Sequence, residues 1–115
     1  MAKTRGTGLM MVWTDIDTEF EAEFNRWYDE EHLPAVVNVP GVISGRRLRI
    51  AEGSEPVAGE RMALSSLALY ELEEAAVATS DALLSATRPT PWRQRIGDGM
   101  EAHVQLYLPR AGLEC

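Results

Sequence analysis

Residues 26–41 read RWYDEEHLPAVVNVPG, and the two prolines in this stretch decide where the chain changes direction. Pro34 disfavours helical geometry at the residue before it, so a helix that enters the stretch should stop or kink near His32. Pro40-Gly41 then predicts a turn. The stretch begins within a run of aromatic residues at helical spacing, which predicts an amphipathic helix with one apolar stripe: Phe20, Phe24, Trp27 and Tyr28.

The segments on either side predict the remaining elements. Thr18 and Glu21 have the spacing of a capping box, so the helix should begin there. Apolar or alternating runs predict strands at 8–14, 42–50, 62–72 and 100–108, and an alanine-rich run predicts a second helix at 73–86. A loop is expected at 51–61 and an irregular connection at 87–99.

The order β-α-β-β-α-β is that of the ferredoxin-like split unit. It predicts an α+β fold, in which a four-stranded antiparallel sheet carries both helices on one face. At 115 residues the chain should form one domain, residues 1–115.

Both faces of the predicted sheet are apolar. In the first strand Leu9, Met11 and Trp13 alternate with Met10 and Val12. A lone domain would leave one of these faces in water, which monomers avoid. We therefore expect a homodimer in which a second copy covers it.

The net charge, the cysteine count and the length of the apolar runs exclude several classes of protein. A net charge of −7 argues against nucleic acid and anionic membranes as partners, since both attract basic patches. The single cysteine, Cys115, cannot form an internal disulfide and fits a reducing compartment. No apolar run approaches the length of a membrane span or a secretory signal, so a soluble cytoplasmic protein is expected.

Glu31 and His32 follow the aromatic run directly. A rotation of about 100° per residue turns Glu31 toward the apolar stripe, and a buried carboxylate needs a partner. We expect a cationic one, Arg46 or Arg47, with His32 a weaker candidate. His32 lies four residues after Tyr28 and should share its flank of the helix.

Two interpretations of this pair remain open. In the functional one, Trp27 and Tyr28 form the apolar wall of a cleft, His32 is the general acid or base, and Glu31 or Arg47 orients it or stabilises an oxyanion. In the structural one, Glu31 reaches an arginine that locks the helix end, and His32 favours the helix dipole. Spacing alone favours the structural interpretation, because structural ion pairs also gather such residues.

Two further residues are candidates for a pocket. Trp92 could cap it, although a tryptophan in a connection is more often a core residue. His103, on the polar face of the last strand, is either a second pocket group or a polar residue facing a barrel. The two histidines lack the spacing of a ligand set, so no metal is expected. Glycine-rich nucleotide loops are also absent.

The segment FNRWYDEEHLPAVVNVPGVISGRRLR, residues 24–49, resembles the pattern of EthD-like dimeric α/β-barrel proteins, in which W-Y-x-x-E-H-x-P is followed by P-G-V and an arginine-rich strand. The later TPWRQR is similar to the same kind of protein. Leu48 departs from the pattern, because an aromatic residue is common there. The matching residues are Trp27, Tyr28, Glu31, His32, Pro34, Pro40, Gly41, Val42 and Arg47.

The resemblance implies a homodimer whose two sheets close into a barrel, with a pocket in each subunit. Relatives on this architecture include aromatic polyketide cyclases, cofactor-free monooxygenases, lactone isomerases and haem enzymes, so the fold alone does not choose the chemistry. The leading hypothesis is a small cofactor-independent enzyme that uses His32 acid/base chemistry on an aromatic or polyketide-like molecule. The alternatives are a non-catalytic ligand-binding module and a structural dimer without a pocket. A haem enzyme is a distant fourth, with His32 as its axial ligand.

Overall fold

A computed structural model describes residues 7–49, 66–97 and 100–110. The predicted loop at 51–61, the start of the predicted third strand and Cys115 lie outside these residues. The strands are β1 (Gly8–Ile16), β2 (Val42–Arg49), β3 (Ser66–Leu72) and β4 (Met100–Tyr107), and the α-helices are α1 (Glu21–Trp27), α2 (Leu33–Val37), α3 (Asp81–Ala86) and α4 (Pro91–Ile96).

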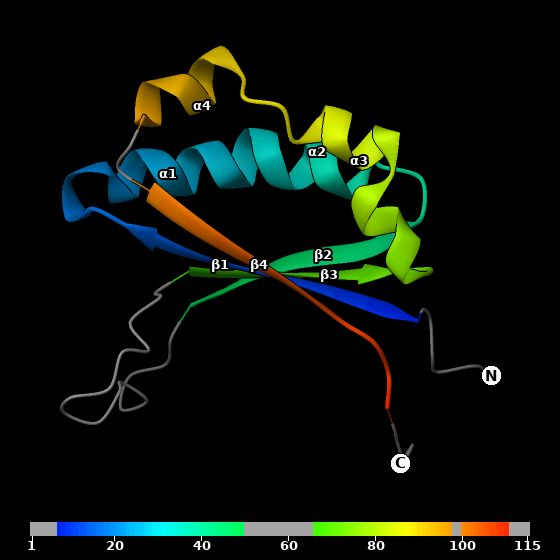
Figure 1. Ribbon diagram of the computed structural model, residues 1–115. Coiled ribbons are helices and arrows are strands. Elements are labelled where there is room, and N and C mark those ends of the chain that lie inside the picture. Colours follow the sequence, from blue (N-terminus) through cyan, green and yellow to red (C-terminus); the bar gives the residue numbers. More distant parts are fainter. Residues whose placement is uncertain (1–6, 50–65, 98–99, 111–115) are drawn as a thin grey trace, which may run out of the picture.

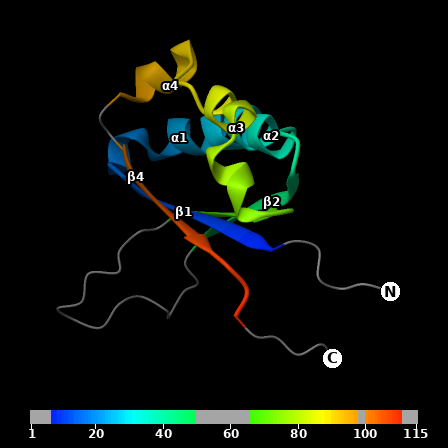
Figure 2. The same cartoon turned by 45° about the vertical axis from the view of Figure 1, so that its right-hand side comes forward.

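The four strands form one antiparallel sheet in the order β2-β3-β1-β4. All four α-helices lie on one face of this sheet (Figures 1 and 2). The predicted α+β ferredoxin-like fold is confirmed, with α4 as an additional helix between α3 and β4. No helix in the described part of the chain is both long enough and apolar enough to cross a membrane.

The first helical segment is continuous but changes its winding. A 3₁₀ turn at Thr18–Phe20 leads into α1, a π-helical turn covers Tyr28–His32, and α2 follows with Pro34 in its first turn. The helix therefore does not stop near His32 as predicted: Leu33 keeps helical dihedral angles before Pro34, and the chain passes through a π-helical turn into α2. The predicted capping box is wrong, because no side chain caps the 3₁₀ turn or α1.

The second half differs more from the prediction. Instead of one helix at 73–86, a 3₁₀ helix (Ala75–Thr79) is followed by α3, because Ser80 is extended and its hydroxyl accepts a hydrogen bond from the Leu83 N–H. The connection at 87–99 is not wholly irregular, since it contains α4. Thr90 caps α4 in the same way, by accepting from the Arg93 N–H at 3.1 Å.

The core lies between the helices and the covered face of the sheet. Gly45 makes room in it: β2 pairs this residue with Tyr70, and the absent side chain lets the tyrosine ring lie close to the β2 backbone. The largest fully buried hydrophobic side chains come from β3 and from three of the helices: Tyr70, Leu72, Phe24, Val36 and Ile96.

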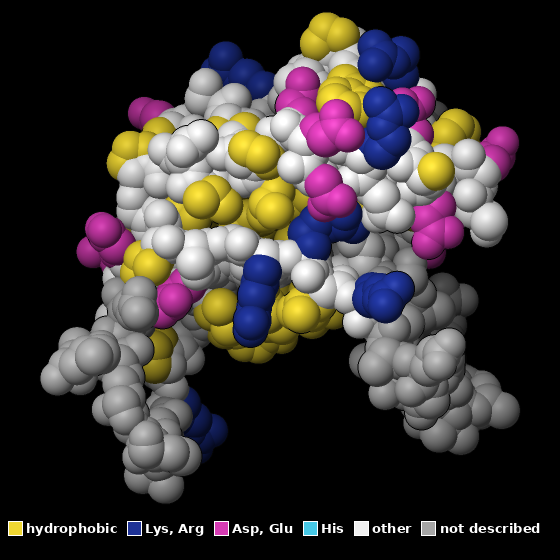
Figure 3. Space-filling view, turned by 180° about the vertical axis from the view of Figure 1, so that it is seen from behind, with side chains coloured by type: hydrophobic (Ala, Val, Ile, Leu, Met, Phe, Trp, Pro, Cys, Tyr) yellow, Lys and Arg dark blue, Asp and Glu magenta, His cyan; other side chains and the backbone are white. Residues whose placement is uncertain are grey.

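The opposite face of the sheet carries no helix. Alternation along β1 and β3 turns a set of half-buried apolar side chains to this outer face: Leu9, Met11, Trp13, Leu67 and Leu69. Hydrophobic side chains gather along the lower edge of the body in Figure 3. The predicted second apolar face is therefore present.

Replacement of Gly45 by alanine tests the packing of Tyr70. A Cβ atom here would lie 2.8 Å from the Tyr70 ring and 2.8 Å from a Val37 methyl group, closer than real contacts allow. We expect Gly45→Ala to lower the free energy of unfolding by about 1–3 kcal/mol, measured by urea denaturation. The control Ser44→Ala, an exposed neighbour on β2, should have little effect. Equal stability of Gly45→Ala and the wild type would contradict this packing.

Candidate active site

A cavity of about 360 Å³ lies between the helices and the sheet. Its lining includes Trp27, Tyr28 and His32 from the first helical segment, Tyr70 from β3 and Arg93 from α4. Most of the remaining lining is apolar and includes residues of β1, α2, α3 and β4. The volume lies in the range of small-molecule sites, which are mostly apolar with a few polar groups.

His32 is held in this wall by aromatic contacts. Its ring stacks on Trp27, with centroids 4.6 Å apart, and meets the edge of Tyr28 at 4.8 Å. Burial lowers the pKa of His32 to about 4, with Glu31 opposing the shift and Arg93 adding to it. The imidazole is therefore neutral at pH 7.

Glu31 lies beside the imidazole but binds neutral partners. Its carboxylate accepts one hydrogen bond from the Trp27 indole N–H at 2.7 Å and one from the Thr90 hydroxyl at 2.6 Å. The expectation of a cationic partner, Arg46 or Arg47, is wrong. The carboxylate instead fixes the ring on which His32 stacks.

Two buried tyrosines extend the polar part of the cavity. The Tyr28 and Tyr70 hydroxyl groups are 2.7 Å apart and form a hydrogen bond. Burial raises the pKa of both phenols, so both remain protonated near neutral pH. Tyr70 was not identified as a site residue from the sequence, because its alternation on β3 is equally typical of a core position.

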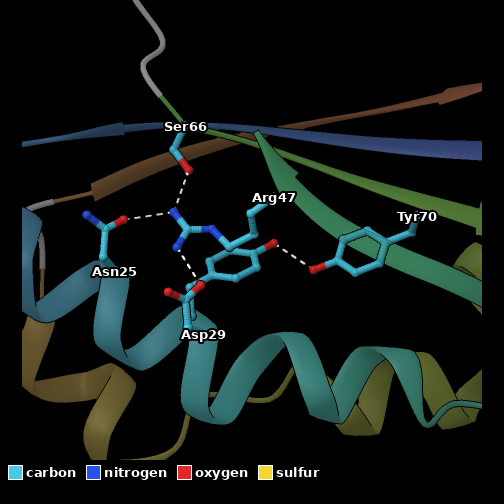
Figure 4. Close-up of polar contacts among 6 residues, drawn as sticks. Asn25, Asp29, Arg47, Ser66 and Tyr70 are labelled. Atoms are coloured by element: carbon cyan, nitrogen blue, oxygen red, sulfur yellow. Dashed lines mark hydrogen bonds and ion pairs between the residues drawn. The ribbon is translucent and has the colours of Figure 1, made fainter. Parts of the chain in front are cut away.

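Arg47 lies outside this cavity, against the ring of Tyr28. Its guanidinium carbon is 4.8 Å from the Tyr28 ring centroid. It donates hydrogen bonds to Asp29 and Asn25, each at 2.8 Å, and to Ser66 at 3.1 Å (Figure 4). Arg47 lines a separate hollow and does not face the His32 cavity. The structure therefore does not bring it together with His32.

Trp92 and His103 are also absent from the lining of the cavity. The Trp92 indole donates to Glu23 at 3.2 Å, which attaches α4 to α1. His103 lies on the outer face, paired with Trp13, and its nearest carboxylate is Glu101 at 3.8 Å. Of the seven residues singled out as site candidates from the sequence, only Trp27, Tyr28 and His32 line the cavity, with Glu31 directly behind them.

Arg93 lines the cavity and was missed from the sequence. Its guanidinium carbon is 5.9 Å from the Trp27 ring centroid, and one of its amino groups donates to the Gly97 carbonyl at 3.2 Å. The sequence pattern that could have identified α4 is the pair Thr90-Pro91, because threonine is a common helix cap and proline suits the first helical position. It predicts a helix with Arg93 in its first turn.

No group of three or more histidine, cysteine, aspartate or glutamate side chains forms a metal site within residues 7–49, 66–97 and 100–110.

The sequence matches no family model and no curated protein. Solved structures do share its fold. The heme-degrader MhuD of Mycobacterium tuberculosis, with two hemes bound in its active site, has a TM-score of 0.61 at 12% identity, covering 93% of this chain and 99% of that one. HapK of Hahella chejuensis has a TM-score of 0.58 at 10% identity, covering 94% and 97%. SnoaB of Streptomyces nogalater, a cofactor-independent oxygenase, has a TM-score of 0.51 at 15% identity, covering 94% and 98%. At these identities the likeness shows the fold.

The buried neutral histidine should make stability depend on pH. His32 has a pKa of about 4 in the folded state and an ordinary value near 6.5 in the unfolded state, so the unfolded chain binds more protons between these values. Its contribution is fully present above about pH 6.5 and should fall by about 3 kcal/mol as the pH drops to about 4.

Urea denaturation across this pH range measures the effect. His32→Gln should remove this part of the pH dependence, whereas His103→Gln, which changes the other histidine on the outer face, should keep it. An unchanged pH dependence in His32→Gln would contradict a neutral buried imidazole.

Proposed function

We propose that this chain is a small cofactor-independent enzyme that acts on an aromatic or polyketide-like molecule bound in the His32 cavity, by cyclase, isomerase or monooxygenase chemistry. The observation that carries the proposal is a neutral imidazole that faces an apolar cavity and is held between two aromatic rings. A flat aromatic ligand suits such walls. A shared fold with a cofactor-independent oxygenase supports the same class of chemistry.

The depressed pKa sets the role of His32. A neutral imidazole can accept a proton at pH 7, whereas a group with a pKa of about 4 is almost never protonated there and cannot serve as a resting general acid. It is also a weak base, so the substrate proton must be acidic, as in a hydroxyaromatic ring or a carbon between two carbonyl groups. The anion that forms would raise the pKa of the imidazole as it accepts the proton.

Glu31 acts as a positioning residue in this proposal. It holds the Trp27 indole under the imidazole, and its negative charge favours the imidazolium that forms during proton transfer. Trp27 and Tyr28 would contact the ring of the substrate. The oxyanion role expected of Arg47 passes to Arg93, which lines the cavity.

A non-catalytic ligand-binding module is the second candidate. The observation that favours it is the same low pKa, since a weak base is poorly suited to abstracting protons from most carbon acids. In that case His32 would only exchange a hydrogen bond with the ligand.

Turnover in a His32 variant separates these functions. A thermal-shift screen with hydroxyaromatic compounds and quinones would identify a ligand, whose conversion would then be followed by absorbance and oxygen uptake. We expect His32→Gln to keep the fold and lower turnover at least about a hundredfold. Glu30→Gln, a neighbouring exposed variant, should leave turnover unchanged.

Full turnover in His32→Gln would remove the imidazole from the mechanism. Ligand-induced stabilisation of the wild type without any conversion would favour the binding module.

We also propose that the protein is a homodimer of the EthD-like, α/β-barrel type, in which the outer faces of two sheets pack against each other. The half-buried side chains of Met11, Trp13 and Leu69 on this face support the proposal, because a contiguous apolar face is unfavourable in water. His103 would then face the interior of the barrel.

Light scattering after gel filtration tests the dimer. The 12.7 kDa chain should elute with twice that mass, about 25 kDa. Leu69→Glu should give a folded monomer by circular dichroism, because it places a charge in the proposed interface. Ala82→Glu, an exposed substitution on α3, should remain dimeric. A monomeric wild type at micromolar concentration would contradict the proposal.

A further inference from the structure

The cavity has a charge opposite to that of the chain. Its lining comprises seventeen described residues, of which Arg93 is the only arginine or lysine and none is an aspartate or glutamate. The whole chain carries a net charge of −7. Arg93 therefore gives a mostly apolar cavity a positive charge, although the chain as a whole is acidic.

The contacts of Arg93 leave its charge largely uncompensated. One amino group donates to the Gly97 carbonyl, and the guanidinium lies near the Trp27 ring. Within the described part of the chain, no carboxylate lies within ion-pair distance of Arg93. A half-buried cation bordered by apolar side chains favours an anion that arrives with the ligand, because a charge pair is stronger where water is excluded.

The neighbouring His32 fits the same ligand group. Its imidazole is neutral. Among the described residues, no hydrogen bond joins its nitrogen atoms to another side chain, since the neighbouring Trp27, Tyr28 and Glu31 bond elsewhere. An imidazole N–H can therefore donate to one oxygen of an anion while the guanidinium donates to another. A carboxylate offers two oxygens, and guanidinium–carboxylate pairs are among the strongest hydrogen-bonded pairs in proteins.

We propose that the ligand of this cavity is an aromatic carboxylate, whose ring lies among Trp27, Tyr28 and the apolar wall and whose carboxylate binds Arg93. This inference rests on the proposed function of the same cavity and narrows its substrate class. It assigns to Arg93 the recognition of the charged group.

Calorimetric titration with 2-naphthoate and 2-naphthamide tests the inference, because the two ligands share a ring system and differ in charge. We expect the wild type to bind the acid at least about tenfold more tightly than the amide. Arg93→Gln should abolish this preference and Arg93→Lys should retain part of it. Arg95→Gln removes the same charge from an exposed position on α4 and should keep the preference.

The outcomes separate this inference from the proposed function. Equal affinity of the wild type for acid and amide would overturn the carboxylate inference and leave the cavity as a binding site for aromatic molecules. A preference that persists in Arg93→Gln would also overturn it. Binding of neither compound by the folded protein, checked by circular dichroism, would overturn both the inference and the aromatic substrate of the proposed function.

Discussion

The Glu31 carboxylate holds together two parts of the site that lie far apart in the sequence. Thr90, 59 residues away, donates its hydroxyl hydrogen to Glu31 and also accepts from the Arg93 N–H as the cap of α4. Trp27 donates to the same carboxylate and carries the stacked His32 ring. One charged group thus fixes both the platform of the imidazole and the start of the helix that bears Arg93. Hydrogen bonds to a charged group contribute about 1.5–3 kcal/mol each.

Tyr28 divides the interior into two polar regions with different properties. On one side the two amino groups of Arg47 donate to Asn25, Asp29 and Ser66 and join the first helix to the sheet, while its buried Nε has no hydrogen-bond partner among the described residues. On the other side the tyrosine lines the cavity together with His32, Tyr70 and Arg93. Arg47 forms an ion pair with Asp29, whereas Arg93 has no carboxylate within ion-pair distance among the described residues. This contrast explains why Arg93, and not Arg47, suits recognition.

The sequence predicted the fold well because the fold follows from the hydrophobic periodicity of each segment and from the order of the strands and helices, both of which can be read along the chain. It also located His32 and its aromatic neighbours, since Trp27–Glu31 and Tyr28–His32 are both four residues apart. The sequence wrongly placed Arg47 beside His32. Strand periodicity predicts which face of the sheet a side chain occupies, but it does not predict that Tyr28 separates Arg47 from the cavity. The sequence also missed Arg93, because a six-residue helix is too short for a periodic pattern and is set by its cap. The partner of Glu31 was wrong because Thr90 reaches it only through tertiary packing.

Adjacent residues in the first helical segment contact different partners, because successive helical side chains point about 100° apart. Glu31 and His32 both lie in its π-helical turn, yet Glu31 binds behind the cavity wall and His32 forms part of the wall. Each contacts the aromatic residue four positions before it, and those two aromatic residues are themselves adjacent, with ring centroids 5.5 Å apart. The carboxylate therefore acts on the imidazole through its charge and through the Trp27 ring. Both hydrogen bonds that Glu31 accepts, from Trp27 and Thr90, go to one carboxylate oxygen, Oε2, so the carboxylate is anchored behind the wall by that oxygen.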